Sequence, residues 1–445
     1  MSGDWGGIAL VAAGFLGLIA AAELWSRLGG ARPESSRKLV HVGGGLLCLT
    51  LPWLVSSPWS VLVLAAASTA VLALGRRGGR LRGLHRVERR TLGSEYYPLA
   101  VFLAFLVSEG RAWLFVCGIL VLALADAGAA LVGTRHGRYR YSVEERDKSV
   151  EGSLAFLAVA FAAVTGPMLL MTGYAPALIL VAALQVALLM TGLEAISLDG
   201  SDNVFVPVGV CVILSKIVSH SLAEAVYQCA SLLVLAALVV WLVRRVRTFN
   251  AGGTIAFLLF VYAAWSMGSE LWALPVLAGF LLYAGACAFV PRPATEAPEV
   301  RVRLVFRAVL APFMLLTIGN MFRIGPLFYV PFLGTCACVL AITLWNHVGG
   351  PTGGTALALP GRIAATAAVG SAAAAVVLAL PLLLSPLLSG FAAAGVGATV
   401  ALASAVNGTV QRGRAPAGGP WGGLQLGLAF ATGGLLLLLE GGCTG

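Results

Sequence analysis

The stretch ERDKSVEGSLAFLAVAFAAVTGPMLLM, residues 145–171, decides how the rest of the chain is interpreted. Its first seven residues include five charged side chains, and the twenty residues that follow include none. A helix needs about 20 apolar residues to cross the hydrocarbon core of a bilayer. The pattern therefore predicts a membrane-spanning helix near 149–171, with a charged segment at the membrane edge.

Similar apolar runs fill the rest of the chain. Of the 445 residues, 59% are hydrophobic and 11% are charged, whereas a soluble domain has about 25% charged residues. We therefore predict an integral membrane protein, an all-α, polytopic transmembrane bundle of about 14–16 spans. The spans are predicted near 7–28, 38–55, 59–75, 96–108, 112–133, 149–171, 176–198, 204–220, 223–243, 251–268, 271–290, 304–319, 326–346, 362–384, 387–406 and 421–439. The first run is too long for a signal peptide and is expected to be retained.

Positive charge gathers in loops that fall on one side of the predicted membrane. The formal net charge is +10, and arginines cluster at 75–90, 135–148 and 244–247. The positive-inside rule makes this side cytoplasmic, so the charge is interpreted as a topology signal and no nucleic-acid partner is expected. The composition, rich in alanine, glycine and arginine, favours the inner membrane of a bacterium. The eight cysteines have no CxxC or CxxH spacing, so neither a metal site nor a disulfide is expected from them.

Acidic and basic side chains divide the chain into two predicted domains, 1–248 and 249–445. All five aspartates and all three lysines occur at or before Lys216. Chemistry with a metal ion and phosphate uses hard carboxylate oxygens and cationic donors. That chemistry is therefore expected in the first domain. The second is predicted to be a further helical bundle, to which the sequence assigns no role.

Two of the four polar clusters lie in or beside the spans near 112–133 and 149–171. Asp126 lies within the span near 112–133, and a charged residue inside a membrane span is costly and usually lines a site or pairs with a partner. Lys148 and Glu151 lie three residues apart, on one face if the helix has already begun, next to the bare backbone of Gly152 and Ser153. The plainer interpretations are a structural ion pair for Asp126 and an interfacial salt bridge for Lys148.

The other two clusters fall on the same predicted side. Glu194 lies inside a span, and the turn that follows it carries Asp199, Asp202 and Asn203. The remaining cluster, Arg37, Lys38 and His41, begins the span near 38–55. The plainer interpretation of the cluster at 194–203 is a polar turn with a helix cap. The plainer interpretation of His41 is a structural histidine. The joint placement of the four clusters favours a site at the cytoplasmic end of the bundle.

These clusters, in this order, resemble the CTP-dependent lipid kinase family that includes dolichol kinase and phytol kinase. The resemblance covers roughly residues 30–220 and is carried by RKLVH at 37–41, DAGAALVG at 126–133, KSVEGSLAF at 148–156 and EAISLDGSDNVFVP at 194–207. It implies a membrane enzyme that transfers the terminal phosphate of CTP to the hydroxyl of an isoprenoid-type lipid alcohol. The middle motifs are also similar to the CDP-diacylglycerol synthases, whose later motifs this sequence lacks.

The resemblance implies roles for the clustered residues. Mg²⁺ would be held by Asp126 and Asp202, with Glu151 and Asn203 as further oxygen donors. Lys148 would hold the β- and γ-phosphates, with the backbone N–H groups of Gly152 and Ser153 as further donors. Arg37 and Lys38 would hold phosphate or orient the lipid. The proton of the alcohol would pass to Glu194 or His41.

Two other functions compete with the kinase at this stage. A CDP-lipid synthase would use the same nucleotide and release pyrophosphate. A lipid transporter or flippase would suit the number of spans, although the acidic residues cluster at one face and do not run through the bilayer. The residues do not identify the lipid alcohol, the preference for CTP over ATP, or the oligomeric state.

Overall fold

A computed structural model describes residues 3–28, 33–77, 93–144, 146–246, 249–289, 300–348, 368–375, 377, 396–404 and 427–436. The chain divides into two compact units, Met1–Leu233 and Val234–Gly445. The helix α12 (Leu222–Val246) continues from the first unit into the second. The boundary predicted after residue 248 stays a prediction.

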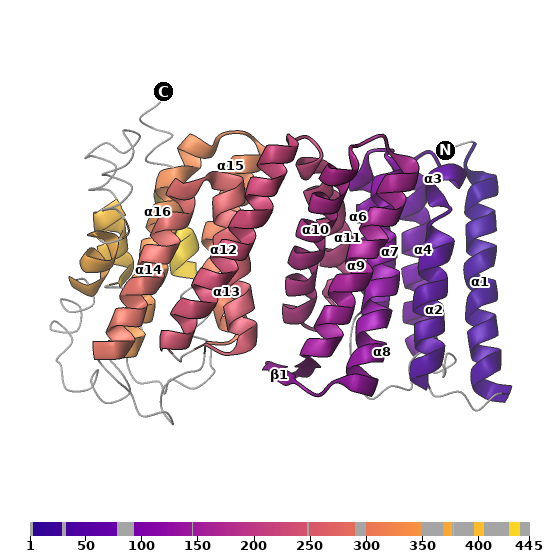
Figure 1. Cartoon of the computed structure of the whole chain (residues 1–445), viewed down its shortest axis with the longest axis horizontal. Coiled ribbons are helices and arrows are strands. Elements are labelled where there is room, and N and C mark those ends of the chain that lie inside the picture. The colour runs from indigo at the N-terminus through magenta and orange to yellow at the C-terminus, as the bar shows by residue number, and fades with distance from the viewer. Residues whose placement is uncertain are drawn as a thin grey trace. The chain divides into compact units, whose positions relative to one another are not determined.

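Unit 1 is a bundle of helices (Figure 1). Its elements before α12 are α1 (Trp5–Leu28), α2 (Pro33–Cys48), α3 (Leu51–Leu54), α4 (Pro58–Arg77), α6 (Gly93–Ser108), α7 (Ala112–Leu120), η1 (Val121–Ala125), α8 (Asp126–His136), β1 (Arg140–Val143), β2 (Arg146–Ser149), α9 (Val150–Met171), α10 (Pro176–Ile196) and α11 (Asp202–Ile217). In unit 2 the described elements are α13 (Ala251–Ala263), η2 (Ala264–Gly268), α14 (Glu270–Phe289), α15 (Val302–Met321) and α16 (Gly325–Val348).

The predicted polytopic, all-α membrane fold is confirmed. Nine helical segments in the described part of the chain are long and apolar enough to cross a membrane, among them Ala112–His136, Val150–Met171 and Pro176–Ile196. The spans predicted near 38–55, 59–75 and 96–108 correspond to shorter apolar helices. The spans predicted at 362–384, 387–406 and 421–439 fall partly outside the described residues, so the total of sixteen stays a prediction.

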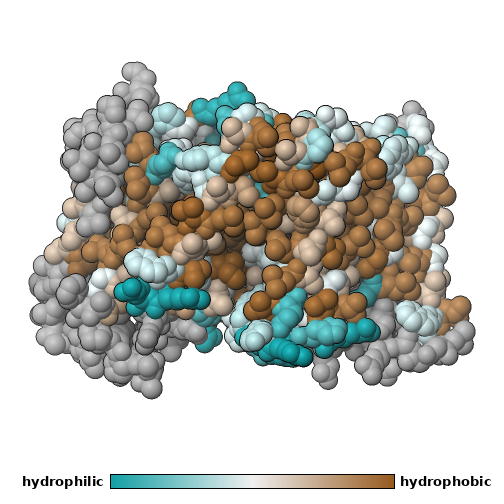
Figure 2. Space-filling model, in the orientation of Figure 1, coloured by the Kyte–Doolittle hydropathy of each residue, from teal (hydrophilic) through white to brown (hydrophobic). Residues whose placement is uncertain are grey.

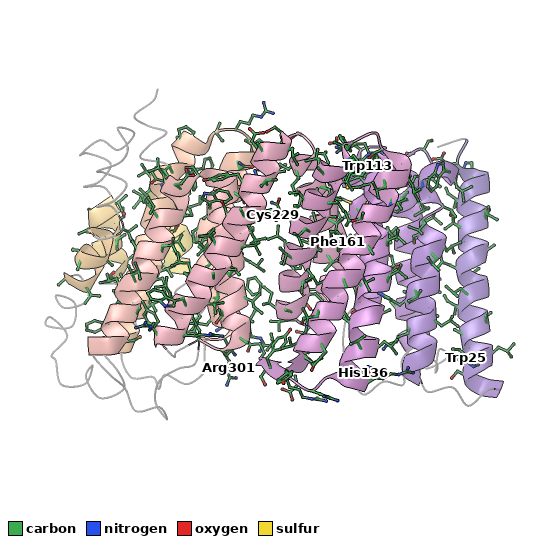
Figure 3. All side chains as sticks on the ribbon, viewed as in Figure 1. Trp25, Trp113, His136, Phe161, Cys229 and Arg301 are labelled. Atoms are coloured by element: carbon green, nitrogen blue, oxygen red, sulfur yellow. The ribbon has the colours of Figure 1, made fainter. Side chains whose placement is uncertain are left out.

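The two ends of the unit 1 helices differ in character. His136 and Trp25 lie at one end, and Trp113 lies at the other (Figure 3). Apolar residues cover the sides of the helices, while hydrophilic residues gather at the end that carries β1 (Figure 2). That end holds the hairpin and the turn between α10 and α11, so two of the predicted clusters lie at the same end of the bundle.

One small element departs from the expected helices. Strands β1 and β2 form an antiparallel hairpin between α8 and α9, with Tyr141 opposite Lys148 and Val143 opposite Arg146. Lys148 therefore lies on a strand, and α9 begins only at Val150. The conditional expectation that Lys148 and Glu151 share one helical face is wrong, because the helix has not begun at Lys148.

At the opposite end of the bundle, Asp4 has a structural role. Asp4 precedes α1 and is buried, and its carboxylate accepts hydrogen bonds from the backbone N–H of Ser56 and Ser57 and the hydroxyls of Ser56 and Ser60, at 2.8–3.1 Å. Hydrogen bonds, led by that from Ser60, hold the pKa of Asp4 well below its usual range. Asp4 therefore ties the start of α1 to the connection between α3 and α4.

Glycines bring α8 and α9 into close contact. A Cβ atom added to Gly152 would lie 3.1 Å from the carbonyl oxygen of Ala129 and 3.3 Å from the Cα of Gly133. In contrast, a Cβ atom on Gly166 of the same helix would meet nothing within 4 Å. Small residues at such crossings let membrane helices approach closely. The spacing of α8 and α9 therefore depends on Gly152.

We expect Gly152→Val to destabilise the protein by about 2 kcal/mol, because the branched side chain would meet the backbone of α8. The matched change Gly166→Val should leave the thermal unfolding midpoint in detergent nearly unchanged. Equal midpoints for the two variants would contradict the assigned helix contact.

Candidate active site

Asp126 is positioned by an irregularity in its own helix. The segment η1 is a π-helical turn, and Asp126 begins α8 directly after it. Such turns contain one extra residue, rotate the side chains that follow and are frequent at functional sites. The Asp126 Oδ2 atom lies 3.6 Å from Nε2 of His41, and this ring nitrogen also lies 3.2 Å from the carbonyl oxygen of Leu122. The structure thus brings the first and second motifs together.

Tyr97 holds His41 from a third helix. Its hydroxyl donates a hydrogen bond of 3.3 Å to the carbonyl oxygen of His41, and the two rings are 5.1 Å apart in an edge-to-face arrangement. The side chain of His41 is 14% exposed and that of Asp126 is 36% exposed. The histidine is therefore fixed inside the bundle, while the carboxylate beside it is open to a ligand.

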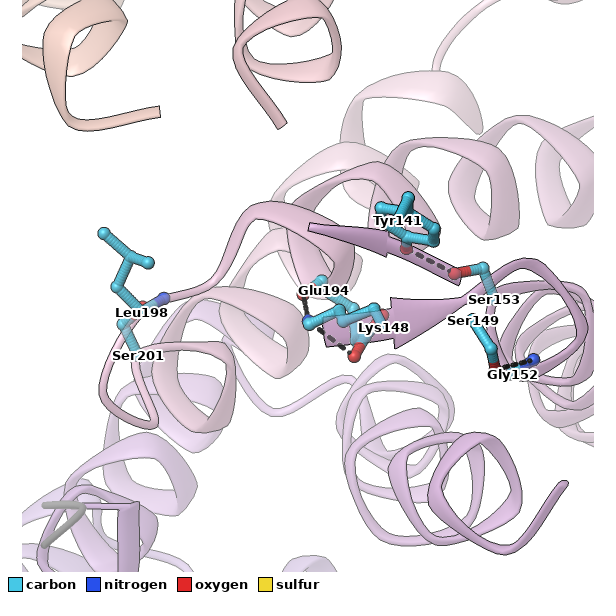
Figure 4. Close-up of polar contacts among 8 residues, drawn as sticks. All are labelled: Tyr141, Lys148, Ser149, Gly152, Ser153, Glu194, Leu198 and Ser201. Atoms are coloured by element: carbon cyan, nitrogen blue, oxygen red, sulfur yellow. Dashed lines mark hydrogen bonds and ion pairs between the residues drawn. The ribbon is translucent and has the colours of Figure 1, made fainter. Parts of the chain in front are cut away.

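Lys148 connects the third and fourth motifs. Its Nζ atom lies 2.9 Å from Oε1 of Glu194, and it also donates to the carbonyl oxygen of Glu194 (Figure 4). The side chains are only 19% and 12% exposed. Lys148 is contributed by β2 and Glu194 by the last turn of α10, 46 residues later. The predicted interfacial salt bridge exists, but its acidic partner is Glu194.

Asp202 completes a group of carboxylates. It begins α11, and burial raises its pKa to about 6, with the nearby charges of Asp126 and Glu194 acting in the same direction and Lys148 opposing them. The side chains of Asp126, Lys148 and Glu194 are therefore close enough to Asp202 for their charges to act on it. We call these four residues, together with His41, the acidic cluster.

The acidic cluster fits a divalent cation together with a phosphate. It contains three carboxylates, from Asp126, Glu194 and Asp202, and Lys148 neutralises one of them. Within the described ranges, no three His, Cys, Asp or Glu side chains are arranged closely enough to hold a metal by themselves. Mg²⁺ is commonly held by one or two carboxylates, with substrate phosphates and waters as its other ligands. Asp126 and Asp202 suit that role.

Glu151, Gly152 and Ser153 make local contacts in the structure. The carboxylate of Glu151 accepts the backbone N–H groups of Arg138 and Tyr139 at 3.0–3.3 Å. The hydroxyl of Ser149 caps α9 by accepting the N–H of Gly152 at 3.1 Å. Glu151 therefore orders the loop before β1, and the N–H of Gly152 already has an acceptor. Their assignment to metal and phosphate stays a prediction.

The three other predicted residues lie near the ends of their helices. Arg37 and Lys38 are in α2, one turn before His41; Lys38 is half-buried, and the side chain of Arg37 lies outside the described residues. Asn203 follows Asp202 in the first turn of α11. The roles given to these residues stay predictions.

Sequence reasoning missed two residues of the hairpin, Tyr141 and Arg146. The hydroxyl of Tyr141 lies 2.7 Å from that of Ser153, and burial together with the charge of Glu194 raises its pKa, so it is protonated at neutral pH. Arg146 forms an ion pair of 2.9 Å with Asp199. The alternation of polar and apolar residues at 140–143 is a signal that indicates the first of these strands, whereas residues 146–149 are all polar and carry no such signal.

Comparison with known proteins gives one informative match. Over 202 residues the chain is 37% identical to the protein named phytol kinase from Synechocystis sp.. The match covers 45% of this chain and 86% of that protein. No protein-family model matches the chain, and no solved structure does.

Proposed function

The chain belongs to the phytol kinase family, and we propose that it is a membrane-embedded kinase that transfers the terminal phosphate of CTP to an isoprenoid-type alcohol such as phytol or a polyprenol. The observation that supports this most is the convergence of four separate motifs on the acidic cluster at one end of unit 1. A lipid alcohol presents its hydroxyl at the level of the headgroups, where a nucleotide can meet it. The position of the cluster at the end of the helices (Figure 1) supports a site at that level.

The proposed reaction is a displacement at phosphorus. The oxygen of the alcohol attacks the γ-phosphorus of CTP, the bond from that phosphorus to the bridging oxygen breaks, and CDP leaves with the electron pair. The proton of the alcohol passes to Glu194 or His41. Most of the catalysis in such transfers comes from positioning and from neutralising charge. Lys148 supplies a positive charge for the β- and γ-phosphates.

Mg²⁺ is the proposed cofactor, held by Asp126 and Asp202. When bound, it would neutralise charge on the phosphate oxygens and orient them. Asp126 is suited to this because its carboxylate is more exposed than His41 beside it. Asp202 is suited because it is half-buried and the negative charges of Asp126 and Glu194 act on it, so a bound cation would offset them.

We further propose that this end of unit 1 faces the cytoplasm, because CTP is made there and the arginine-rich loops of the sequence favour that side. The proposed location is the inner membrane of a bacterium. The partners would be CTP, the alcohol and surrounding membrane lipids.

The test is a phosphotransfer assay with purified protein in detergent, Mg²⁺ and a panel of lipid alcohols. CTP labelled at the γ-phosphate and CTP labelled at the α-phosphate are supplied in parallel. Transfer of the γ-label alone, with release of CDP, is expected. Transfer of the α-label would instead identify a CDP-lipid synthase, and no transfer to any alcohol would exclude the kinase. Replacing CTP by ATP measures the preference for the donor.

Unit 2 is expected to contribute little to the transfer itself. Its Glu270, at the start of α14, accepts a hydrogen bond of 3.4 Å from the indole N–H of Trp265. We expect Glu270→Gln to keep phosphotransfer within about twofold of the wild type, because an exposed side chain with one long hydrogen bond contributes little. Glu194→Gln is the comparison in unit 1 and should reduce transfer strongly. A similar loss in both variants would contradict the assignment of the chemistry to unit 1.

A further inference from the structure

The hairpin has two unlike faces. Opposite residues of an antiparallel pair point to the same side, and neighbours along a strand point to opposite sides. One face therefore carries Tyr141, Val143, Arg146 and Lys148, and the other, the outer face, carries Arg140, Ser142, Asp147 and Ser149. The first face is buried or half-buried, and the outer face is exposed except for Ser149, which is buried where β2 meets α9. The first is called the inner face below.

Every side chain of the inner face meets the bundle. Val143 is 1% exposed, Tyr141 contacts Ser153 on α9, and Lys148 pairs with Glu194 at the end of α10. Arg146 pairs with Asp199, which lies in the turn between α10 and α11. The two cations of this face are two residues apart on β2, so about 7 Å separates them along the strand. They form a row that leads from the acidic cluster to the edge of the bundle.

The partner of Arg146 is held in an unusual backbone conformation. Asp199 has φ of 55° and Gly200 has φ of 88°, so both are left-handed. Aspartate and asparagine tolerate this region better than other residues with a side chain. The turn presents the Asp199 carboxylate at 62% exposure, to a guanidinium that is 34% exposed. Ion pairs with this much exposure contribute little to stability, so the pair can separate at small cost.

We propose that Arg146 is a second phosphate-binding cation of the nucleotide site, and that it exchanges Asp199 for a phosphate oxygen when the nucleotide binds. This inference rests on the proposed function. A nucleoside triphosphate carries more negative charge than one divalent cation and Lys148 together neutralise. A guanidinium binds phosphate through two parallel hydrogen bonds, whereas an ammonium acts as a point charge. Lys148 would hold the terminal phosphates within the acidic cluster. Arg146 would hold the phosphate nearer the nucleoside.

The proposed exchange predicts that substitutions of Arg146 and of Asp199 change the affinity for CTP in opposite directions. In Arg146→Gln, the affinity for CTP should fall about tenfold, because a charged hydrogen bond is lost. In Asp199→Asn, the affinity should rise by up to about fivefold, because the competing carboxylate is gone while the left-handed turn is kept. If Arg146 served only to tie the hairpin to the turn, both variants would break the same pair and weaken binding alike.

The experiment measures binding of CTP with Mg²⁺ to the full-length protein in detergent, by calorimetry without lipid, and then the KM for CTP and for the alcohol. The control is Arg140→Gln, on the exposed face of the same hairpin, which should match the wild type. Arg146→Lys keeps the charge and should bind CTP more tightly than Arg146→Gln. The KM for the alcohol should not change in any of these variants.

Two results would overturn the proposal. The first is unchanged affinity for CTP in Arg146→Gln; the second is an equal loss in Arg146→Gln and Asp199→Asn. Transfer of the γ-label by the wild type is measured alongside. If the wild type transfers phosphate and either result occurs, only the role of Arg146 fails; if the wild type does not transfer, the proposed function itself fails.

Discussion

Asp126→Asn is expected to lower the rate of phosphotransfer by at least about a thousandfold, because an amide cannot replace the charge that faces the metal and phosphates. The side chain keeps its shape, and its 36% exposure leaves room for the amide. The protein should therefore still insert and fold. The measurement is the initial rate of γ-label transfer by purified protein whose unfolding midpoint has been determined.

Asp147→Asn is the matched control. Asp147 lies on the outer face of the hairpin and accepts a hydrogen bond of 2.8 Å from the hydroxyl of Ser142. It is exposed and close in sequence to Lys148, so its neutralisation tests for a general effect of charge. Its rate should stay within about twofold of the wild type. Normal turnover by Asp126→Asn would remove the central assignment of the site.

The second large effect is expected from Lys148→Met, which should lose both activity and stability. The lysine is the cation closest to the proposed phosphates, and its loss leaves Glu194 charged in a site where it is 12% exposed. Breaking a buried ion pair by removing one partner destabilises a protein by about 3 kcal/mol or more. The unfolding midpoint and the rate of γ-label transfer should therefore fall together.

The double variant Lys148→Met with Glu194→Gln separates these two effects. Removing both charges of a buried pair is often neutral for stability, so the unfolding midpoint should recover. The rate should not recover, because both the cation for the phosphates and the carboxylate proposed to accept the proton are missing. A double variant that regains activity with its stability would show that Lys148 acts only as the structural partner of Glu194.

The general architecture could be predicted from the sequence because the bilayer imposes a length on each helix. The run from Gly152 to Met171 has no charged residue, and the structure ends α9 at Met171. The grouping of polar residues at one end followed from counting spans. His41, Asp126, Lys148, Glu194 and Asp202 all belonged to predicted clusters, and the structure brings them together.

The pairings inside the site could not be predicted in this way. Lys148 and Glu194 are 46 residues apart, and only the packing of α9 on α10 brings the hairpin to the end of α10. The position of Glu151 is compatible with two roles, because a carboxylate at the start of a helix suits a metal ion bound with phosphate as well as an anchor for the preceding loop. Which role it takes depends on the path of residues 137–139, and spacing alone does not determine that path.

The extra residue in η1 has a consequence for comparing this chain with its relatives. The π-helical turn absorbs that residue within Val121–Ala125, so removing one residue there would make the helix regular and leave Asp126 on the face that meets His41. Keeping every residue in a regular helix would instead turn Asp126 by about 100° away from His41. A relative that has a regular helix here must carry its acid one position out of step, so a correct alignment needs a one-residue gap at this segment.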